Sequence, residues 1–165
     1  MNKTIIPAAF IMLGFFTFST QASDVISHRY IGMDLARDLA NEAVIACRKD
    51  GYHISAVVVD RFGNLRAALR DDIASRFTLQ IAEEKANAVV MAGISSGQFR
   101  DSRGDIRPEL NHINGIIMMQ GGLPINAGGS RIGAIGVSGA PGGEKDEACA
   151  EKALDVVMER LEFAE

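Results

Sequence analysis

The chain has 165 residues, with 17 Lys and Arg against 21 Asp and Glu, so its formal net charge at pH 7 is −4. A mildly acidic chain with no basic run, and no interleaving of basic and aromatic residues, argues against nucleic acid and anionic membranes as partners. The sequence shows no low-complexity segment and no internal repeat.

The first 22 residues are organised like a secretory signal peptide. Lys3 supplies the positive start, Ile5 to Phe18 is an almost unbroken apolar run, and Ala22 ends a group of small residues that suits a signal peptidase. The apolar run is too short to span a bilayer. We therefore expect cleavage after Ala22, export to the periplasm or the medium, and one domain over residues 23–165 with no membrane segment.

The domain is predicted to begin with a helix and a β-hairpin. Apolar residues recur at helical spacing between Tyr30 and Asp50, at Ala36, Leu39, Ala40, Ala43 and Cys47. The hairpin strands are residues 53–60 and 65–70, with Asp60 expected to cap the turn. Because the first strand is apolar on both faces, it is predicted to be central in its sheet.

The remaining elements complete an α+β pattern. A second helix is expected over residues 71–93, with Ser75 as N-cap and an inward face formed by Phe77, Ile81, Ala88 and Val89. Residues 94–111 lack periodicity and are predicted to be a long loop. Short strands are expected at 114–119, 123–126 and 131–138. A closing helix over 144–163 should turn Cys149, Ala153, Val156 and Val157 inward. The order α-β-β-α-β-β-β-α predicts a single layered domain with a mainly antiparallel five-stranded sheet.

The two cysteines, Cys47 and Cys149, are too far apart for a CxxC redox pair. Export would permit a disulfide between them. Each also falls on the apolar side of a predicted helix, where a buried thiol is ordinary. Both alternatives stay open, because the sequence does not supply the distance between their Cα atoms.

A glycine-rich stretch begins at Gly121, and it matches neither a phosphate-binding loop nor a nucleophile elbow. Glycine in a strand is usually tolerated where another element or a ligand approaches the backbone. We expect Gly133, Gly136 and Gly139 to admit the terminal helix at close range and to let the chain turn. Gly121 and Gly122 are expected to expose their backbone beside a pocket.

These blocks resemble a known family. GGLPI and IGAIGVSGAPGGEKDEACAEKAL are similar to the signature of the HbpS/GlcG haem-binding family, which is related to the C-terminal domain of PduO. VVVDRFGNLRAALRDD and IAEEKANAVV match its earlier blocks in the same order. The resemblance implies a compact domain with an antiparallel sheet, often assembled into homo-oligomers. It also implies haem binding in some members, with haem degradation proposed for the group.

The haem ligand is not fixed by the resemblance, so it is sought among donors that haem iron accepts: imidazole, thiolate, thioether or phenolate. His112 stands before INGIIMMQGG, at the mouth of a pocket if Gly121 and Gly122 form its floor. It is the first candidate ligand, against the alternative of a solvated loop histidine. Met119 offers a thioether nearby, with core packing as its alternative.

Other candidate residues follow from the same requirements. His28, on the terminal segment, is the alternative iron ligand, whereas His53 is expected to be structural. Arg76 and Lys85 are candidates for the propionates, although nine residues on a helix point them to different faces. For Lys85 the alternative is a buried stem with a satisfied ammonium. Tyr30 and Tyr52 are further possible ligands.

The sequence thus predicts an exported, haem-binding homo-oligomer that scavenges, buffers or senses haem, with a sensor or transport protein as a possible partner. No constellation of catalytic residues requires enzymatic haem degradation, which stays open through the resemblance. One alternative is a periplasmic accessory protein of a carbon-utilisation pathway that binds a small organic acid without haem. Another is an oligomer with a purely structural role.

Overall fold

The computed structural model describes residues 24–163, so the expected signal peptide lies outside the described residues. The elements in chain order are α1 (Met33–Lys49), β1 (Ser55–Asp60), β2 (Leu65–Arg70), α2 (Phe77–Ala92), α3 (Ser96–Ser102), α4 (Arg107–Leu110), β3 (Gly122–Ala127), β4 (Ser130–Ser138), α5 (Gly143–Val156) and α6 (Met158–Glu162). Within the described range, no helix is both long and apolar enough to cross a membrane.

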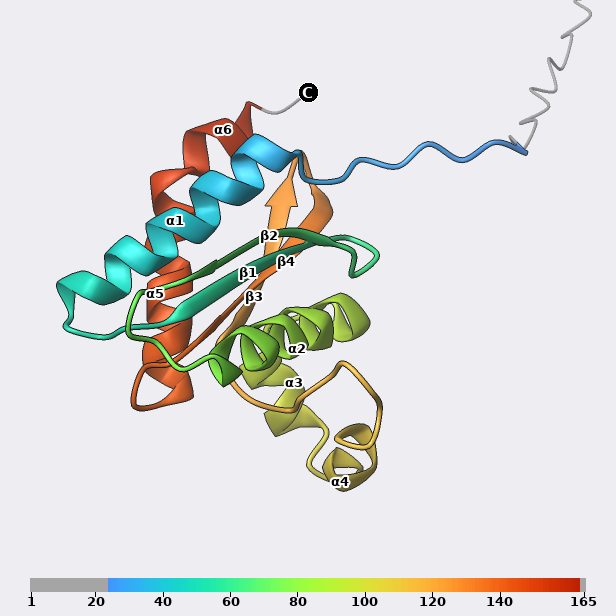
Figure 1. Cartoon of the computed structure of the whole chain (residues 1–165). Coiled ribbons are helices and arrows are strands. Elements are labelled where there is room, and N and C mark those ends of the chain that lie inside the picture. Colours follow the sequence, from blue (N-terminus) through green and yellow to red (C-terminus); the bar gives the residue numbers. More distant parts are fainter. Residues whose placement is uncertain (1–23, 164–165) are drawn as a thin grey trace, which may run out of the picture.

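The strands form one antiparallel sheet with the order β2-β1-β4-β3. Helices α1 and α5 pack on one face and α2 on the other, with α3 and α4 beyond α2 (Figure 1). Strand β1 is buried along its whole length, with Val57 and Val59 in the core beneath α2 and Ala56 and Val58 in the core beneath α1. The predicted α+β class and the central place of this strand are therefore confirmed.

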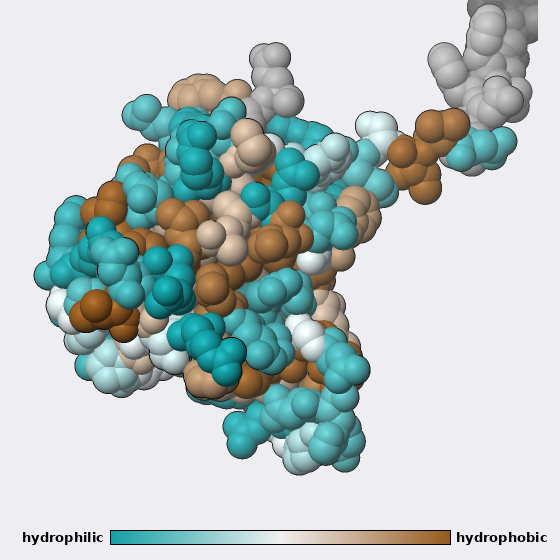
Figure 2. All heavy atoms as spheres, in the orientation of Figure 1, coloured by the Kyte–Doolittle hydropathy of each residue, from teal (hydrophilic) through white to brown (hydrophobic). Residues whose placement is uncertain are grey.

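Strand β2 lies at an edge of the sheet and is only partly covered. A band of hydrophobic surface crosses this side of the molecule between α1 and α2, where β2 runs (Figure 2). Its turn to β1 is capped as predicted: the Asp60 carboxylate accepts hydrogen bonds from the backbone N–H groups of Phe62 and Asn64, at 2.8 and 3.0 Å.

The sheet has four strands, so the prediction of five is wrong. Residues 114–119 do not form a strand, because their backbone binds to side chains and to its own local turns rather than to a neighbouring strand. The Asn87 amide donates to the Gly115 carbonyl at 3.0 Å, and Met118 N–H donates to Asn111 Oδ1 at 2.9 Å. The Met118 side chain is buried in a small core between α2 and the α3–α4 segment.

The prediction of a long loop over residues 94–111 is also wrong, since this segment contains α3 and α4. Ser95 caps α3 by accepting a hydrogen bond from Gln98 N–H at 3.2 Å. Phe99 and Leu110 are buried in the same small core as Met118. Packing of these two side chains stabilises helices that are too short to show periodicity in the sequence.

Four expectations about helix faces and ends need correction. The N-cap of α2 is Arg76 rather than Ser75, and Phe77 is 58% exposed instead of inward because it stands at the first turn, beyond the sheet. The closing helix is divided at Val157 into α5 and α6, and Val156 is exposed. The expected inward residues of α1, together with Ala88, Val89, Cys149, Ala153 and Val157, are all buried.

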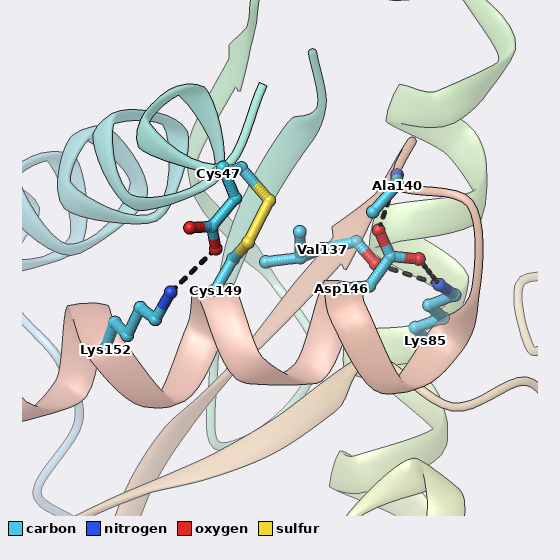
Figure 3. Close-up of a disulfide and its surroundings, with 8 residues drawn as sticks. Cys47, Lys85, Val137, Ala140, Asp146, Cys149 and Lys152 are labelled. Atoms are coloured by element: carbon cyan, nitrogen blue, oxygen red, sulfur yellow. Dashed lines mark hydrogen bonds and ion pairs between the residues drawn. A yellow bond between two sulfur atoms is a disulfide. The ribbon is translucent and has the colours of Figure 1, made fainter. Parts of the chain in front are cut away.

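Cys47 and Cys149 form a disulfide with a Cα–Cα distance of 5.4 Å. It joins α1 to α5 on one face of the sheet (Figure 3). The structure thus decides between the two alternatives that the sequence left open.

Gly136 of β4 admits α2, so the expectation that this glycine admits the terminal helix is wrong. A Cβ atom at Gly136 would lie 1.9 Å from the Ala82 carbonyl oxygen of α2. Gly133 faces the opposite side of the sheet, where a Cβ atom would lie 3.1 Å from the Ile31 side chain. The close approach of α2 to β4 brings the second helix's lysine to the end of that strand.

Candidate functional site

A buried ion pair lies where β4 ends and α5 begins. Lys85 of α2 is fully buried, and its Nζ donates to Asp146 Oδ2 at 2.7 Å and to the Val137 carbonyl at 2.9 Å. The other Asp146 oxygen accepts a hydrogen bond from Ala140 N–H at 2.9 Å (Figure 3). Burial lowers the pKa of Lys85 and raises the pKa of Asp146, while their mutual attraction opposes both shifts and favours the charged pair.

The pair of glycines in GGLPI packs against this ion pair. A Cβ atom at Gly121 would lie 2.8 Å from Lys85 Nζ, and one at Gly122 would lie 2.6 Å from the Lys85 carbonyl oxygen. Both glycines are buried, so their backbone does not face an open pocket as we expected from the sequence. Lys85 has the alternative role that we considered for it, as a buried stem with a satisfied ammonium.

The expected site near His112 contains a pocket of about 380 Å³ bordered by Glu84, Asn111 and residues 113–119. Met119 lines it and is 42% exposed, whereas His112 is an exposed neighbour outside the lining. Glu84 places a carboxylate in the wall, and no Lys or Arg is among the lining residues. The pocket therefore suits a neutral or cationic group better than an anionic one.

Arg76 does not join either cluster. Its guanidinium stacks on the exposed ring of Phe77, 4.2 Å from the ring centroid, at the start of α2. Arg76 is exposed and Lys85 is buried, which confirms that the two cations point to different faces of this helix.

A second pocket, of about 300 Å³, lies beside the extended segment before α1, which we call the arm (residues 24–30). His28, Arg29 and Tyr30 line it together with Ile31, Gly32, Leu35, Ala127 and Ile132. The His28 ring meets Phe62 of the β1–β2 turn edge to face at 5.3 Å, and the Arg66 guanidinium lies 5.5 Å from the Tyr30 ring centroid. The arm runs from α1 away from the domain (Figure 1).

The third histidine, His53, has a structural environment as predicted. Its Nδ1 lies 3.0 Å from Asp71 Oδ2, and Arg48 binds both oxygens of the same carboxylate at 2.7 and 2.8 Å. The Arg48 hydrogen bonds hold the pKa of the buried Asp71 carboxyl well below its usual range. This cluster lies outside the pockets described above, and in the described range no group of three His, Cys, Asp or Glu side chains could hold a metal ion.

Sequence reasoning missed Asp146 as the partner of Lys85 and missed the pocket beside the arm. Asp146 is one of three acids at the start of the last helix, where a carboxylate ordinarily only stabilises the helix N-terminus. The sequence did contain a signal that Lys85 has a buried partner, because Lys85 stands among Ala82, Ala86 and Val89, which all face the sheet. A lysine on such a face needs a buried partner.

A four-stranded antiparallel sheet covered by helices on both faces, with pockets at its rim, places the chain in a class of small layered α+β domains. Residues 31–155 match the family model described as "Haem degrading protein HbpS-like". The chain belongs to this HbpS-like family. No curated protein matches the chain.

Solved structures show the same relationship. HbpS is 32% identical to the chain, with a TM-score of 0.77, over 85% of this chain and 99% of HbpS. Protein ORFY of Klebsiella pneumoniae is 26% identical, with a TM-score of 0.75, over 82% of this chain and 96% of ORFY. The PduOC–haem complex is 21% identical, with a TM-score of 0.67, over 76% of this chain and 94% of PduOC, a likeness of fold.

The two pockets differ in how well their side chains suit a haem. Haem needs an iron donor, an apolar slot and, for its two propionates, cations. The pocket at Met119 offers a thioether but carries the Glu84 carboxylate and no cation. The arm offers imidazole, phenol and guanidinium groups above the buried side chains of Ile31 and Ile132, so its donor set fits the group.

Proposed function

We propose that the protein is an exported haem-binding protein that scavenges, buffers or senses haem. The observation that carries this proposal is membership in the HbpS-like family, over residues 31–155. The haem complex of PduOC, a protein of the same fold, supports it, as does the donor set beside the arm.

The disulfide supports export. Disulfides persist in oxidising compartments and are rare in the cytosol, and here Cys47 and Cys149 are bonded to each other. We propose cleavage after Ala22 and a periplasmic or secreted location. The mass of the protein recovered from the periplasm or medium tests this, since cleavage there would leave Ser23 as the first residue.

Homo-oligomer formation and contact with a sensor or transport protein remain part of the proposal through family membership. The family description also favours haem degradation as a second candidate. Degradation would consume an external reductant and oxygen. Loss of the Soret band in the presence of ascorbate and air, with release of iron, would support it, and a stable band would restrict the function to binding.

The experiment that tests haem binding is a titration of the purified protein with hemin, followed by Soret absorbance, beside a calorimetric titration with small organic acids. We expect a saturable Soret shift and no heat from the acids. No saturable shift would contradict the proposal, and binding of an acid instead would favour the accessory protein without haem.

A further inference from the structure

We propose that haem binds beside the arm, with His28 as the iron ligand and Tyr30 and Phe62 as aromatic walls. This inference rests on the proposed haem binding and adds the location of the binding site. The family match begins at Ile31, so no residue of the arm is assigned by it.

Among the three histidines, only His28 combines an open imidazole with a pocket. Neither ring nitrogen of His28 forms a hydrogen bond with the described residues, and the ring contacts Phe62 by its edge. His53 has one nitrogen held by Asp71. His112 stands outside the lining of the neighbouring pocket. An imidazole nitrogen with its lone pair exposed is the commonest protein donor to iron and other metals.

His28 borders a pocket with a buried apolar floor and, outside the lining of that pocket, contacts the ring of Phe62. Ile31, Ala127 and Ile132 are nearly or fully inaccessible beneath the pocket. Tyr30 and Phe62 are 55% and 59% exposed, and the Phe62 ring contacts the His28 ring. A flat apolar macrocycle would cover these rings and recover that buried area.

Two arginines lie beside these aromatic rings. The guanidinium groups of Arg66 and Arg61 lie 5.5 and 5.6 Å from the ring centroids of Tyr30 and Phe62. Neither arginine forms an ion pair with any described residue, and Arg66 Nε is buried without a hydrogen-bond partner. Two such guanidinium groups suit the two carboxylates of haem, whereas the pocket that contains Glu84 has no Lys or Arg in its lining.

The test is a hemin titration of the wild type and of His28→Ala, His53→Ala and His112→Ala, followed by Soret absorbance and by the EPR spectrum of the ferric complex. His53 is the matched control. Like His28 it is partly exposed and has a tyrosine close by in the sequence (Tyr52), but it borders neither pocket. We expect His28→Ala to weaken hemin binding by at least about tenfold and to change the Soret maximum and EPR spectrum. The two control variants should match the wild type.

A second variant, Arg61→Gln with Arg66→Gln, separates the propionate contacts from the iron ligand. We expect affinity to fall roughly tenfold while the Soret maximum stays in place, because the iron donor is unchanged. Since His28 is exposed on the arm, its removal should leave the melting temperature unaltered.

The outcomes distinguish the site from the function. If the wild type shows no saturable Soret shift, the proposed function fails and the site with it. If the wild type saturates and His28→Ala behaves identically, the site is wrong while haem binding stands. Loss of binding in His112→Ala alone would move the site to the pocket beside Met119.

Discussion

Replacing Lys85 by methionine should destabilise the protein strongly, because it removes one partner of a buried ion pair. Asp146 has a side chain only 5% exposed and would lose its 2.7 Å contact with Lys85 Nζ. Breaking a buried pair in this way costs about 3–5 kcal/mol. Methionine keeps the length and apolar character of the lysine stem, so little of this cost comes from a cavity.

The assay is urea unfolding at pH 7 followed by circular dichroism. With an m-value of about 2 kcal/mol/M, the midpoint of Lys85→Met should fall by roughly 1.5–2.5 M. Lys152→Met is the matched control, because Lys152 forms a pair with Asp50 at the same 2.7 Å but with both side chains about half exposed. Exposed pairs contribute about 0–1 kcal/mol, so its midpoint should stay near that of the wild type.

The double variant Lys85→Met, Asp146→Asn completes the test. A neutral amide at 146 keeps an acceptor for Ala140 N–H and places a donor near the Val137 carbonyl, so we expect at least half of the lost stability to return. If Lys85→Met costs less than about 1 kcal/mol, or if the double variant is no more stable than the single one, the uncompensated charge of Asp146 is not the cause.

Two further predictions concern stability. The disulfide closes a loop with a sequence separation of 102 residues, for which chain entropy gives about 4.7 kcal/mol. Cys47→Ala with Cys149→Ala should therefore lose about 2–5 kcal/mol in urea unfolding, and a wild type unaffected by full reduction would contradict this. Asp71 has a folded pKa below its unfolded value of about 3.9, so its contribution is present above pH ~4 and is lost as pH falls further. The stability gap between wild type and Asp71→Asn should shrink from about pH 5 to pH 2, and a constant gap in acid titrations would refute the assignment.

The sequence predicted well those elements whose side chains repeat with the period of their structure. The inward residues of α1 and the apolar strand β1 are buried as expected, because apolar residues that repeat with the period of the element form one continuous face, and that face packs in the core. Helices α3 and α4 were not predicted, since the burial of Phe99 and Leu110 in a small core stabilises them instead of a repeating apolar face. Residues 114–119 were wrongly predicted to be a strand. The side-chain amides that bind their backbone belong to Asn87 and Asn111, which lie outside the segment and are not part of its apolar pattern.

The candidate site was less predictable because its parts meet only through tertiary contacts. Three acids begin the last helix, and Asp146 is the one that shares the inward helical face of Cys149 and Ala153, although only the tertiary fold brings that face to Lys85. Gly121, just before β3, leaves room for the lysine ammonium beside Asp146, since a Cβ atom there would lie 2.8 Å from Lys85 Nζ.

The arm shows the same dependence more sharply. His28 and Tyr30 are near neighbours in the sequence, but their partners Phe62 and Arg66 belong to the β1–β2 hairpin. The base of the arm is fixed to the sheet by a hydrogen bond from Ile31 N–H to the Ile132 carbonyl at 3.0 Å, which brings the preceding residues beside that hairpin. In the proposed haem site, the family fold supplies the wall, and the arm, which precedes the family match, supplies the donors. Relatives with the same fold but a different segment before α1 would lack these donors, so they need not bind the same ligand.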